Sequence, residues 1–199
     1  VNDLNYKFVT ITSVTRDDIE DYGLSYFIEI TNRLKKTGVK VEVLIPDLNG
    51  NAKLLDWLME TQPTMINHNI EMAERLYSEI RPQSNFNNTL KILKTAALKK
   101  AEFFVKTGFM VGLGETAGEI KELINIISDA GIDILTIGQY LQPSKKHYPV
   151  QRYVEPQEFD EYRDYAQTKG IPVIQSAPFA RSSYKAFESY SECKRLLSK

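Results

Sequence analysis

The chain has 199 residues, of which 42% are hydrophobic and 26% charged, and its formal net charge is −1. This length fits one large or two small domains with a good core, and the composition is that of an ordinary globular protein. The balanced charge gives no basic surface for nucleic acid, and no apolar run reaches the roughly 18 residues that cross a membrane. The single cysteine, Cys193, excludes an internal disulfide and a zinc site made of cysteines, and it suits a reducing compartment.

Apolar, β-rich runs alternate with amphipathic stretches, and glycine or proline marks most of the boundaries. We predict strands at residues 8–14, 39–45, 64–67, 103–111, 132–138 and 171–175, and helices at 22–36, 53–60, 70–80, 90–100, 117–130, 156–169 and 181–197. The strands lack clean alternation, which indicates a parallel sheet covered on both faces. A barrel and an open doubly wound sheet both fit, and polar residues after several strands favour the barrel.

One predicted strand ends in a glycine-spaced turn, T-G-F-M-V-G-L-G-E-T from Thr107 to Thr116. Gly112 and Gly114 permit a positive φ or the close approach of a ligand to the backbone. Glu115 and Thr116 come where a helix begins, so a carboxylate, a hydroxyl and unpaired N–H groups share one place. The turn therefore either binds a polar ligand or is only a tight connection between strand and helix.

Several single residues have two readings. His68 follows a predicted strand, and one histidine there is more often a hydrogen-bonding residue than a base or ligand. Lys106 lies inside an apolar strand, where it either points inward to a substrate anion or runs outward past a helix. Asp17 and Asp18 could bind a metal, but paired acids after a strand are usually solvated.

Seven stretches occur in the order found in the lipoyl synthase family, which the chain resembles over nearly its whole length: V-T-I-T-S-V-T-R-D-D (9–18), V-L-I-P-D (43–47), N-H-N-I-E (67–71), G-F-M-V-G-L-G-E-T (108–116), D-I-L-T-I-G-Q-Y-L-Q-P-S (133–144), R-Y-V-E-P-Q-E-F (152–159) and R-S-S-Y-K-A (181–186). Each stretch alone is a weak indication, but the ordered set is specific. One local departure is Glu20-Asp21-Tyr22-Gly23, where the family tends to have a Pro-Asp-Gly-Gly turn.

The resemblance implies a radical S-adenosylmethionine enzyme. It implies an α/β fold, a partial (β/α) TIM-like barrel at residues 1–178, followed by a C-terminal segment, 179–199, that carries R-S-S-Y. The implied cofactors are S-adenosyl-L-methionine and two [4Fe–4S] clusters. One cluster would cleave adenosylmethionine to a 5′-deoxyadenosyl radical, and an auxiliary cluster would donate two sulfurs to C6 and C8 of a protein-bound octanoyl-lysine.

The same resemblance implies partners and a compartment. The partners would be octanoylated lipoyl carrier domains of 2-oxoacid dehydrogenase E2 or of the glycine cleavage H protein, with no nucleic acid and no membrane. The expected compartment is the cytoplasm, or a mitochondrion or plastid if the source is eukaryotic.

Site residues also follow from the resemblance. One hydroxyl of the R-S-S-Y motif would be the unusual serine ligand of the auxiliary cluster, and we favour Ser183 over Ser182. The residues expected to bind adenosylmethionine are Thr12, Ser13, Asn67, Asn69, Lys106, Gly112, Gly114, Glu115, Gln139 and Leu141.

The chain lacks the two cysteine triplets that hold the clusters in the family, and Cys193 matches no family ligand. We therefore expect these residues to be the remainder of a longer protein. Two other readings stay open. One is a cluster-free protein that binds adenosylmethionine or a carrier domain on the same scaffold. The other is a metal-free barrel enzyme, such as an aldolase that uses Lys106 as a Schiff-base amine.

Overall fold

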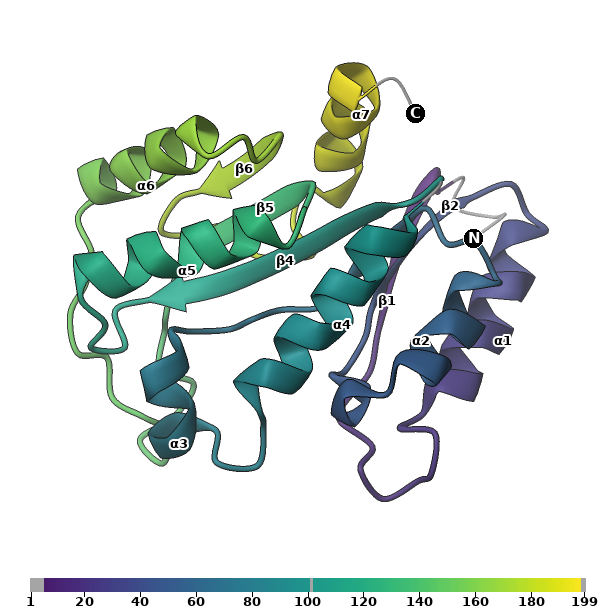
Figure 1. Cartoon of the computed structure of the whole chain (residues 1–199), viewed down its shortest axis with the longest axis horizontal. Helices are drawn as coiled ribbons and strands as arrows, with labels where there is room; N and C mark the ends of the chain where they lie inside the picture. Colours follow the sequence, from purple (N-terminus) through teal and green to yellow (C-terminus); the bar gives the residue numbers. More distant parts are fainter. Residues whose placement is uncertain (1–5, 101, 198–199) are drawn as a thin grey trace.

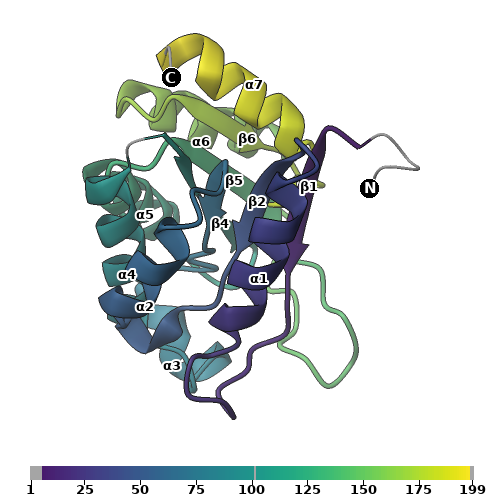
Figure 2. The same cartoon turned by 90° about the vertical axis from the view of Figure 1, so that its right-hand side faces the viewer.

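The structure, a computed structural model, describes residues 6–100 and 102–197. Six parallel strands form one sheet in chain order: β1 (Phe8–Thr12), β2 (Lys40–Leu44), β3 (Met65–Asn67), β4 (Phe104–Val111), β5 (Ile134–Gln139) and β6 (Val173–Ser176). The order never reverses, so the sheet has no switch point of the doubly wound kind. Within the described residues no pairing joins β6 to β1, and the barrel is open. The predicted partial barrel is confirmed (Figures 1 and 2).

Most helices cover the outer face of this sheet (Figure 2). They are α1 (Leu24–Lys35), α2 (Ala52–Met59), α4 (Phe86–Lys99), α5 (Ala117–Asp129) and α6 (Pro156–Thr168), whereas the short α3 (Tyr77–Ile80) lies at the carboxyl edge in the connection between β3 and α4. Two 3₁₀ turns, Leu48–Gly50 and Glu74–Leu76, lie in the connections. None of the described helices is both long and apolar enough to cross a bilayer.

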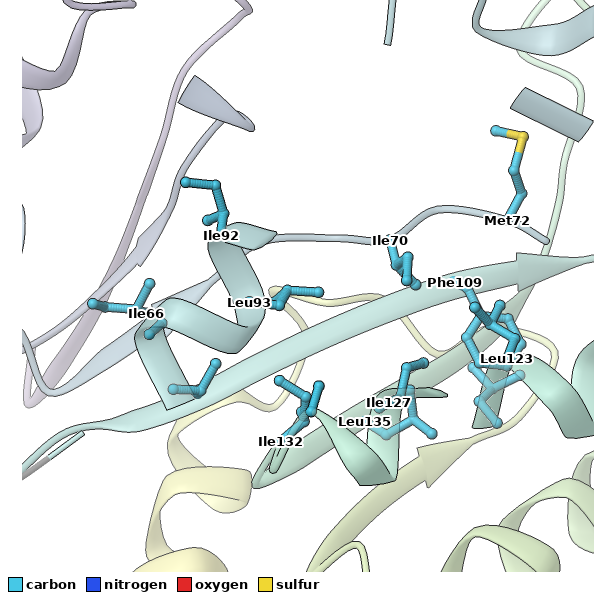
Figure 3. Close-up of a cluster of buried hydrophobic side chains, with 14 of the residues drawn as sticks. Ile66, Ile70, Met72, Ile92, Leu93, Phe109, Leu123, Ile127, Ile132 and Leu135 are labelled. Carbon is cyan, nitrogen blue, oxygen red and sulfur yellow. The ribbon is translucent and has the colours of Figure 1, made fainter. Parts of the chain in front are cut away.

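The main core lies between the sheet and these helices. Alternate strand residues such as Val43, Val105 and Leu135 are fully buried there against helix residues such as Ile92 and Ile127. Figure 3 shows part of this cluster, including Leu135 of β5, Ile127 of α5 and Ile132. Complete burial of each such side chain stabilises the fold by roughly 1.5–3 kcal/mol, and this term holds the helices on the sheet.

The last helix, α7 (Ala186–Leu197), packs on the opposite, inner face of the sheet. It contacts both β1 and β6, the two ends of the open sheet (Figure 2). A second apolar cluster forms here at the amino ends of the strands, and it contains Met65, Phe104, Ile134, Val173 and Cys193. The helix therefore closes the amino end of the barrel and leaves the carboxyl end for a site.

Two of the predicted helices are partly wrong. Residues 70–73 are not helical, because the amide of Glu71 donates to Gly108 O (3.0 Å) and its carbonyl accepts from Met110 N (2.8 Å). These bonds to β4 occupy groups that a helix needs, and helical structure starts only at Glu74. The C-terminal helix likewise begins at Ala186 and not at residue 181.

Candidate functional site

A polar cavity of about 530 Å³ lies at the carboxyl ends of β1, β2 and β3. Its lining includes the hydroxyls of Thr12 and Ser13, the carboxylate of Asp47 after β2, and Asn69 and Glu71 after β3. Parallel strands bring their carboxyl ends to one edge, which is why residues so far apart in the chain meet here. The volume lies in the range of sites that bind small molecules.

His68 lies at the same edge and serves as a hydrogen-bonding residue of the framework. Its Nδ1 is 2.8 Å from Ile45 O, and its Nε2 is 3.1 Å from Thr89 Oγ1. A carbonyl oxygen only accepts, so Nδ1 carries the proton and Nε2 accepts from the threonine hydroxyl. Burial lowers the pKa of His68, which keeps the ring neutral. The imidazole therefore ties β2 to α4.

Glu71 is a carboxylate of the cavity that the sequence analysis did not single out. Its backbone φ is +64°, in the region that side chains rarely adopt, because the chain bends here to pair with β4. Arg81 Nη1 lies 3.4 Å from Glu71 Oε1. Burial raises the pKa of Glu71 and the Arg81 charge opposes that rise. Glu71 was detectable from its place just after a strand, whereas Arg81 follows a helix and has no such local indication.

A buried polar layer lies on the inner face of the sheet. Glu42 and Lys106 are both 0% exposed, and Lys106 Nζ is 3.5 Å from Glu42 Oε1. Glu42 also accepts from Thr10 Oγ1 and from Asn67 Nδ2, each at 2.8 Å. Burial lowers the pKa of Lys106 and Glu42 opposes that shift. The lysine thus points inward, and its enclosed amine does not support the Schiff-base alternative.

The segment that carries R-S-S-Y lies on this polar layer. Lys106 Nζ donates to the carbonyl oxygen of Ser182, and Ser182 Oγ donates to Asn69 Oδ1 at 2.7 Å. The inner face has room because residue 108 is glycine, where a Cβ would sit 3.0 Å from Ser182 Oγ. Ser183, in contrast, is exposed to solvent. The hydroxyl of Ser182 is therefore the one that faces the inside of the barrel.

The glycine-spaced turn after β4 folds back on itself. Glu115 is 8% exposed, and its carboxylate accepts from the amides of Gly112 (2.6 Å) and Leu113 (2.9 Å). Gly112 has a φ of +95°, and a Cβ there would overlap the amide of Gln139. Thr116 forms a capping box with Glu119 at the start of α5. In this arrangement the turn is a tight connection whose carboxylate is already hydrogen-bonded.

Gln139 holds a neighbouring loop. Its Nε2 donates to Arg152 O (3.1 Å) and to Tyr140 O (3.0 Å), and its Oε1 accepts from Val154 N (2.9 Å). The amide is thus occupied on both sides, which fixes residues 152–154 beside the turn after β4. Leu141 follows and is 44% exposed.

The ten residues expected to bind adenosylmethionine fall into three groups. Thr12, Ser13 and Asn69 line the cavity. Asn67 and Lys106 belong to the polar layer. The remaining five lie in or beside the turn after β4 and do not line the cavity: Gly112, Gly114, Glu115, Gln139 and Leu141. Their binding role stays a prediction.

Two buried oxygens on the inner face lack a hydrogen-bond partner among the described residues, Asn67 Oδ1 and Thr136 Oγ1. Thr136 pairs in register with Gly108, so its side chain lies beside Ser182. Buried polar atoms are rarely left unpaired, and a bound water or ligand would supply the missing partner.

A metal centre is not formed by the part of the chain that the structure describes. No group of three His, Cys, Asp or Glu side chains within residues 6–100 and 102–197 could hold a metal ion. Asp18 forms an ion pair with Arg16, with 2.7 Å between Asp18 Oδ1 and Arg16 Nε. Cys193 belongs to α7 and is buried against the sheet, at the end of the barrel away from the cavity.

Comparison with known sequences gives one family and a set of named relatives. The model of the radical SAM superfamily matches residues 1–127. Lipoyl synthase of Caldicellulosiruptor saccharolyticus is 44% identical over 188 residues, covering 94% of this chain and 66% of the relative. Lipoyl synthase of Alkaliphilus metalliredigens is 42% identical over 191 residues, covering 95% and 66%. The chain thus spans slightly less than two thirds of the length of these relatives.

Solved structures share the fold at low sequence identity. A domain of a pyruvate-formate lyase-activating enzyme from Bacteroides vulgatus matches with a TM-score of 0.63 and 13% identity, over 83% of this chain and 98% of the domain. Methylornithine synthase matches with a TM-score of 0.60 and 13% identity, over 96% of this chain and 67% of that protein.

Proposed function

The chain belongs to the radical SAM superfamily, and we propose that it is the adenosylmethionine-binding part of a lipoyl synthase. The complete protein would insert two sulfurs at C6 and C8 of an octanoyl-lysine on a lipoyl carrier domain, of E2 or H-protein type. The observation that carries this proposal is the 42–44% identity to lipoyl synthases over almost the whole chain. We expect the protein in the cytoplasm, or in a mitochondrion or plastid of a eukaryote.

Membership of the superfamily implies a [4Fe–4S] cluster and adenosylmethionine as cofactors. The described residues do not fit a cluster, since they provide no group of three suitable side chains and the one cysteine is buried far from the cavity. The thiolate ligands of this cluster, and of the auxiliary cluster that we propose as the sulfur source, would come from residues outside this chain.

We propose that adenosylmethionine binds in the cavity at the carboxyl edge. This cofactor carries a sulfonium and an ammonium group, and the cavity offers carboxylates for these cations at Asp47 and Glu71. Thr12, Ser13 and Asn69 add hydroxyl and amide groups that can hydrogen-bond to a ribose or to the amino-acid part. The volume of about 530 Å³ is adequate for a ligand of this size.

We propose one hydroxyl of the R-S-S-Y motif as the serine ligand of the auxiliary cluster, with Ser183 preferred and Ser182 as the alternative. Ser183 is exposed to solvent, whereas Ser182 Oγ already donates to Asn69 Oδ1 at 2.7 Å.

The test is a chimera in which this chain replaces the matching residues of the Caldicellulosiruptor lipoyl synthase. We expect the chimera to form deoxyadenosine and to convert an octanoylated carrier domain to the lipoylated form. Mass spectrometry measures both products. The Ser183→Ala chimera should still form deoxyadenosine but lose sulfur insertion, because one proposed ligand of the sulfur source is gone.

The Ser182→Ala chimera is the matched control and should keep both reactions. Normal lipoyl formation by the Ser183→Ala chimera would refute the ligand assignment. Binding of adenosylmethionine by the isolated chain, measured by calorimetry, together with no lipoyl formation by the unchanged chimera, would favour the cluster-free binding protein.

A further inference from the structure

The connection between β5 and α6 is long, and all of its charged side chains before residue 155 are basic. From Ile134 to Val154 the sequence has no Asp or Glu, but it has Lys145, Lys146 and Arg152. The chain as a whole has a net charge of −1, so positive charge is concentrated in this stretch. Residues 140–155 all belong to the described part of the chain, and they form neither helix nor strand. An ordered connection of this length without secondary structure is uncommon and is usually functional.

Hydrogen bonds hold this connection against the rest of the molecule. We define the cationic loop as residues 142–153. Tyr140 Oη donates to Tyr148 O at 2.7 Å, and Gln151 N donates to Gly112 O at 2.9 Å, so the loop is fixed in its middle and near its end. A loop that is already ordered loses little conformational entropy when a partner binds, which makes it a suitable recognition surface.

The charged side chains in the middle of the cationic loop are available to a partner. Lys145 and Lys146 are both exposed, and no ion pair among the described residues involves either of them. Arg152, in contrast, is paired with Glu158, with 2.5 Å between Arg152 Nη1 and Glu158 Oε1. Tyr153, at the end of the loop, is 71% exposed, and tyrosine is enriched at protein interfaces. Two unpaired cations and an exposed aromatic residue in one loop suit an acidic protein surface.

The cationic loop lies at the same edge of the sheet as the cavity. It follows the carboxyl end of β5, and Figure 2 shows it standing out from that edge. Partial burial, and next the Glu79 carboxylate of α3, raise the pKa of Tyr148, so the loop and this helix interact. Tyr77 of the same helix lines the cavity. A protein that delivers a tethered acyl chain to the cavity must therefore approach the edge on which the loop lies.

We propose that the cationic loop docks the carrier domain through an acidic face of that domain beside the octanoyl-lysine. The proposal rests on the proposed function, because that function names the carrier domain as the partner. Complementary charges speed the encounter and orient the domain, so that its acyl chain points towards the cavity. Nucleic acid is a poorer match, because the loop offers two unpaired lysines, whereas nucleic-acid-binding proteins neutralise many phosphates.

The first experiment measures the binding of an octanoylated H protein to the isolated chain by fluorescence anisotropy. We expect the charge reversal Lys145→Glu/Lys146→Glu to raise the dissociation constant at least about tenfold at low salt. The difference should shrink towards about 0.5 M salt, because ions screen exposed charges. Changing the carboxylates next to the octanoyl-lysine of the H protein to amides should weaken binding to the unchanged chain, and it should not weaken binding to the reversed chain further.

Lys91→Glu/Lys94→Glu is the matched control, because both lysines are exposed on α4 and the net charge changes by the same amount. This variant should keep the dissociation constant within about twofold. Equal dissociation constants for the unchanged chain and the loop variant would overturn the proposal. An RNA oligonucleotide is the second probe: loop-dependent binding of RNA, without loop-dependent binding of the H protein, would also contradict it.

The second experiment compares two substrates of the chimera, the octanoylated H protein and a short octanoyl-lysyl peptide without acidic residues. The loop variant should lower kcat/KM for the H protein at least about tenfold, through KM and not through kcat. The kinetic constants for the peptide should stay unchanged, because the peptide has no acidic face. Equal losses with both substrates would indicate a general defect of the variant and would refute the docking role.

These measurements separate the docking role from the proposed function. If the unchanged chimera makes no lipoyl group but binding of the H protein still depends on Lys145 and Lys146, the proposed function fails and the docking surface stands. If the chimera is active and the loop variant treats both substrates as the unchanged chimera does, the proposed function stands and the docking role fails. A lower melting temperature of the loop-variant chimera with an unchanged kcat/KM would show that the loop contacts the rest of the longer protein instead, and it would also refute the docking role.

Discussion

Single residues at the start of α5 show how a short motif acts on stability. Thr116 caps the helix by accepting from Glu119 N at 3.2 Å, and the Glu119 carboxylate accepts from Thr116 N at 2.8 Å. Arg75 Nε lies 2.7 Å from Glu119 Oε1. The arginine, and next the Thr116 amide, lower the pKa of Glu119 to about 2. The Glu119 carboxylate therefore joins the start of α5 to the 3₁₀ turn that contains Arg75.

This shift predicts a pH-dependent contribution to stability. A carboxylate whose pKa falls on folding stabilises the protein above its ordinary pKa of 4.5, and the effect is lost as the pH falls from there towards 2. We expect Glu119→Gln to lower the free energy of unfolding by about 1 kcal/mol at pH 7, a value discounted for partial exposure. Urea denaturation at pH 7 and pH 2.5 should show the difference shrinking at the lower pH.

Glu122→Gln is the control, since Glu122 lies exposed on the same helix. Glu122→Gln should change the free energy of unfolding very little at either pH. A Glu119→Gln effect as large at pH 2.5 as at pH 7 would contradict the assignment of the stabilisation to the charged carboxylate.

At the scale of elements, two glycines of neighbouring strands leave space for the chain at residues 180–184, here called the serine segment, to lie against the sheet. Gly108 of β4 and Gly138 of β5 both face the inner side of the sheet, where the chain from Ala180 to Ser182 crosses it. A Cβ at residue 138 would overlap the carbonyl oxygen of Ala180 and lie 3.0 Å from Arg181 Nη1. The serine segment can therefore lie this close to the sheet only because residues 108 and 138 have no side chains.

Gly138→Ala should push the serine segment away from β5. The clash is with main-chain atoms, so relief requires a backbone shift, and we expect a loss of about 1–3 kcal/mol in the free energy of unfolding. Hydrogen exchange at residues 177–184 should rise at the same time. Gly118→Ala lies in a helix, and its Cβ would make only an ordinary contact of 3.8 Å with Thr116 Oγ1, so this change should be neutral or slightly stabilising. Equal melting temperatures of the two variants would contradict the packing argument.

At the scale of the whole molecule, α7 is the part that closes the open barrel. Its residues Cys193 and Tyr190 pack against Phe104 and other inner-face residues at the amino ends of the strands. Because the helix contacts both β1 and β6, its docking depends on the entire curvature of the sheet. The carboxyl end of the barrel, with the cavity, lies at the other end of the inner face.

The thiol of Cys193 reports on this docking, since it is 0% exposed. We expect its reaction with a thiol reagent to be at least about 100-fold slower in the native protein than in urea, because undocking of α7 must come first. Ser191→Cys/Cys193→Ser moves the thiol to an exposed position of the same helix and should react rapidly in both conditions. Rapid native labelling of Cys193 would show that α7 is not stably docked.

Local sequence patterns were sufficient to predict much of the fold and the edge of the sheet that carries the cavity. The alternation of apolar strands and amphipathic helices predicted the parallel sheet, and polar residues after the strands predicted the edge that carries the cavity. Thr116 was placed correctly at a helix start, and His68 was correctly interpreted as a hydrogen-bonding residue. These features are encoded within a few residues of the chain, by side-chain period and by capping.

Only the tertiary structure decided how the interior of the barrel is arranged. Contacts across 76 and 113 positions turn Ser182 inward and bury Lys106 beneath it, and no local pattern carries such information. Residues 70–73 look helical in sequence, but Glu71 pairs with β4, and its hydrogen bonds to that distant strand compete with those of a helix. The sequence by itself determined the elements and the edge where they meet; the side chains that face the cavity depend on how the sheet curves and on which segments it brings together.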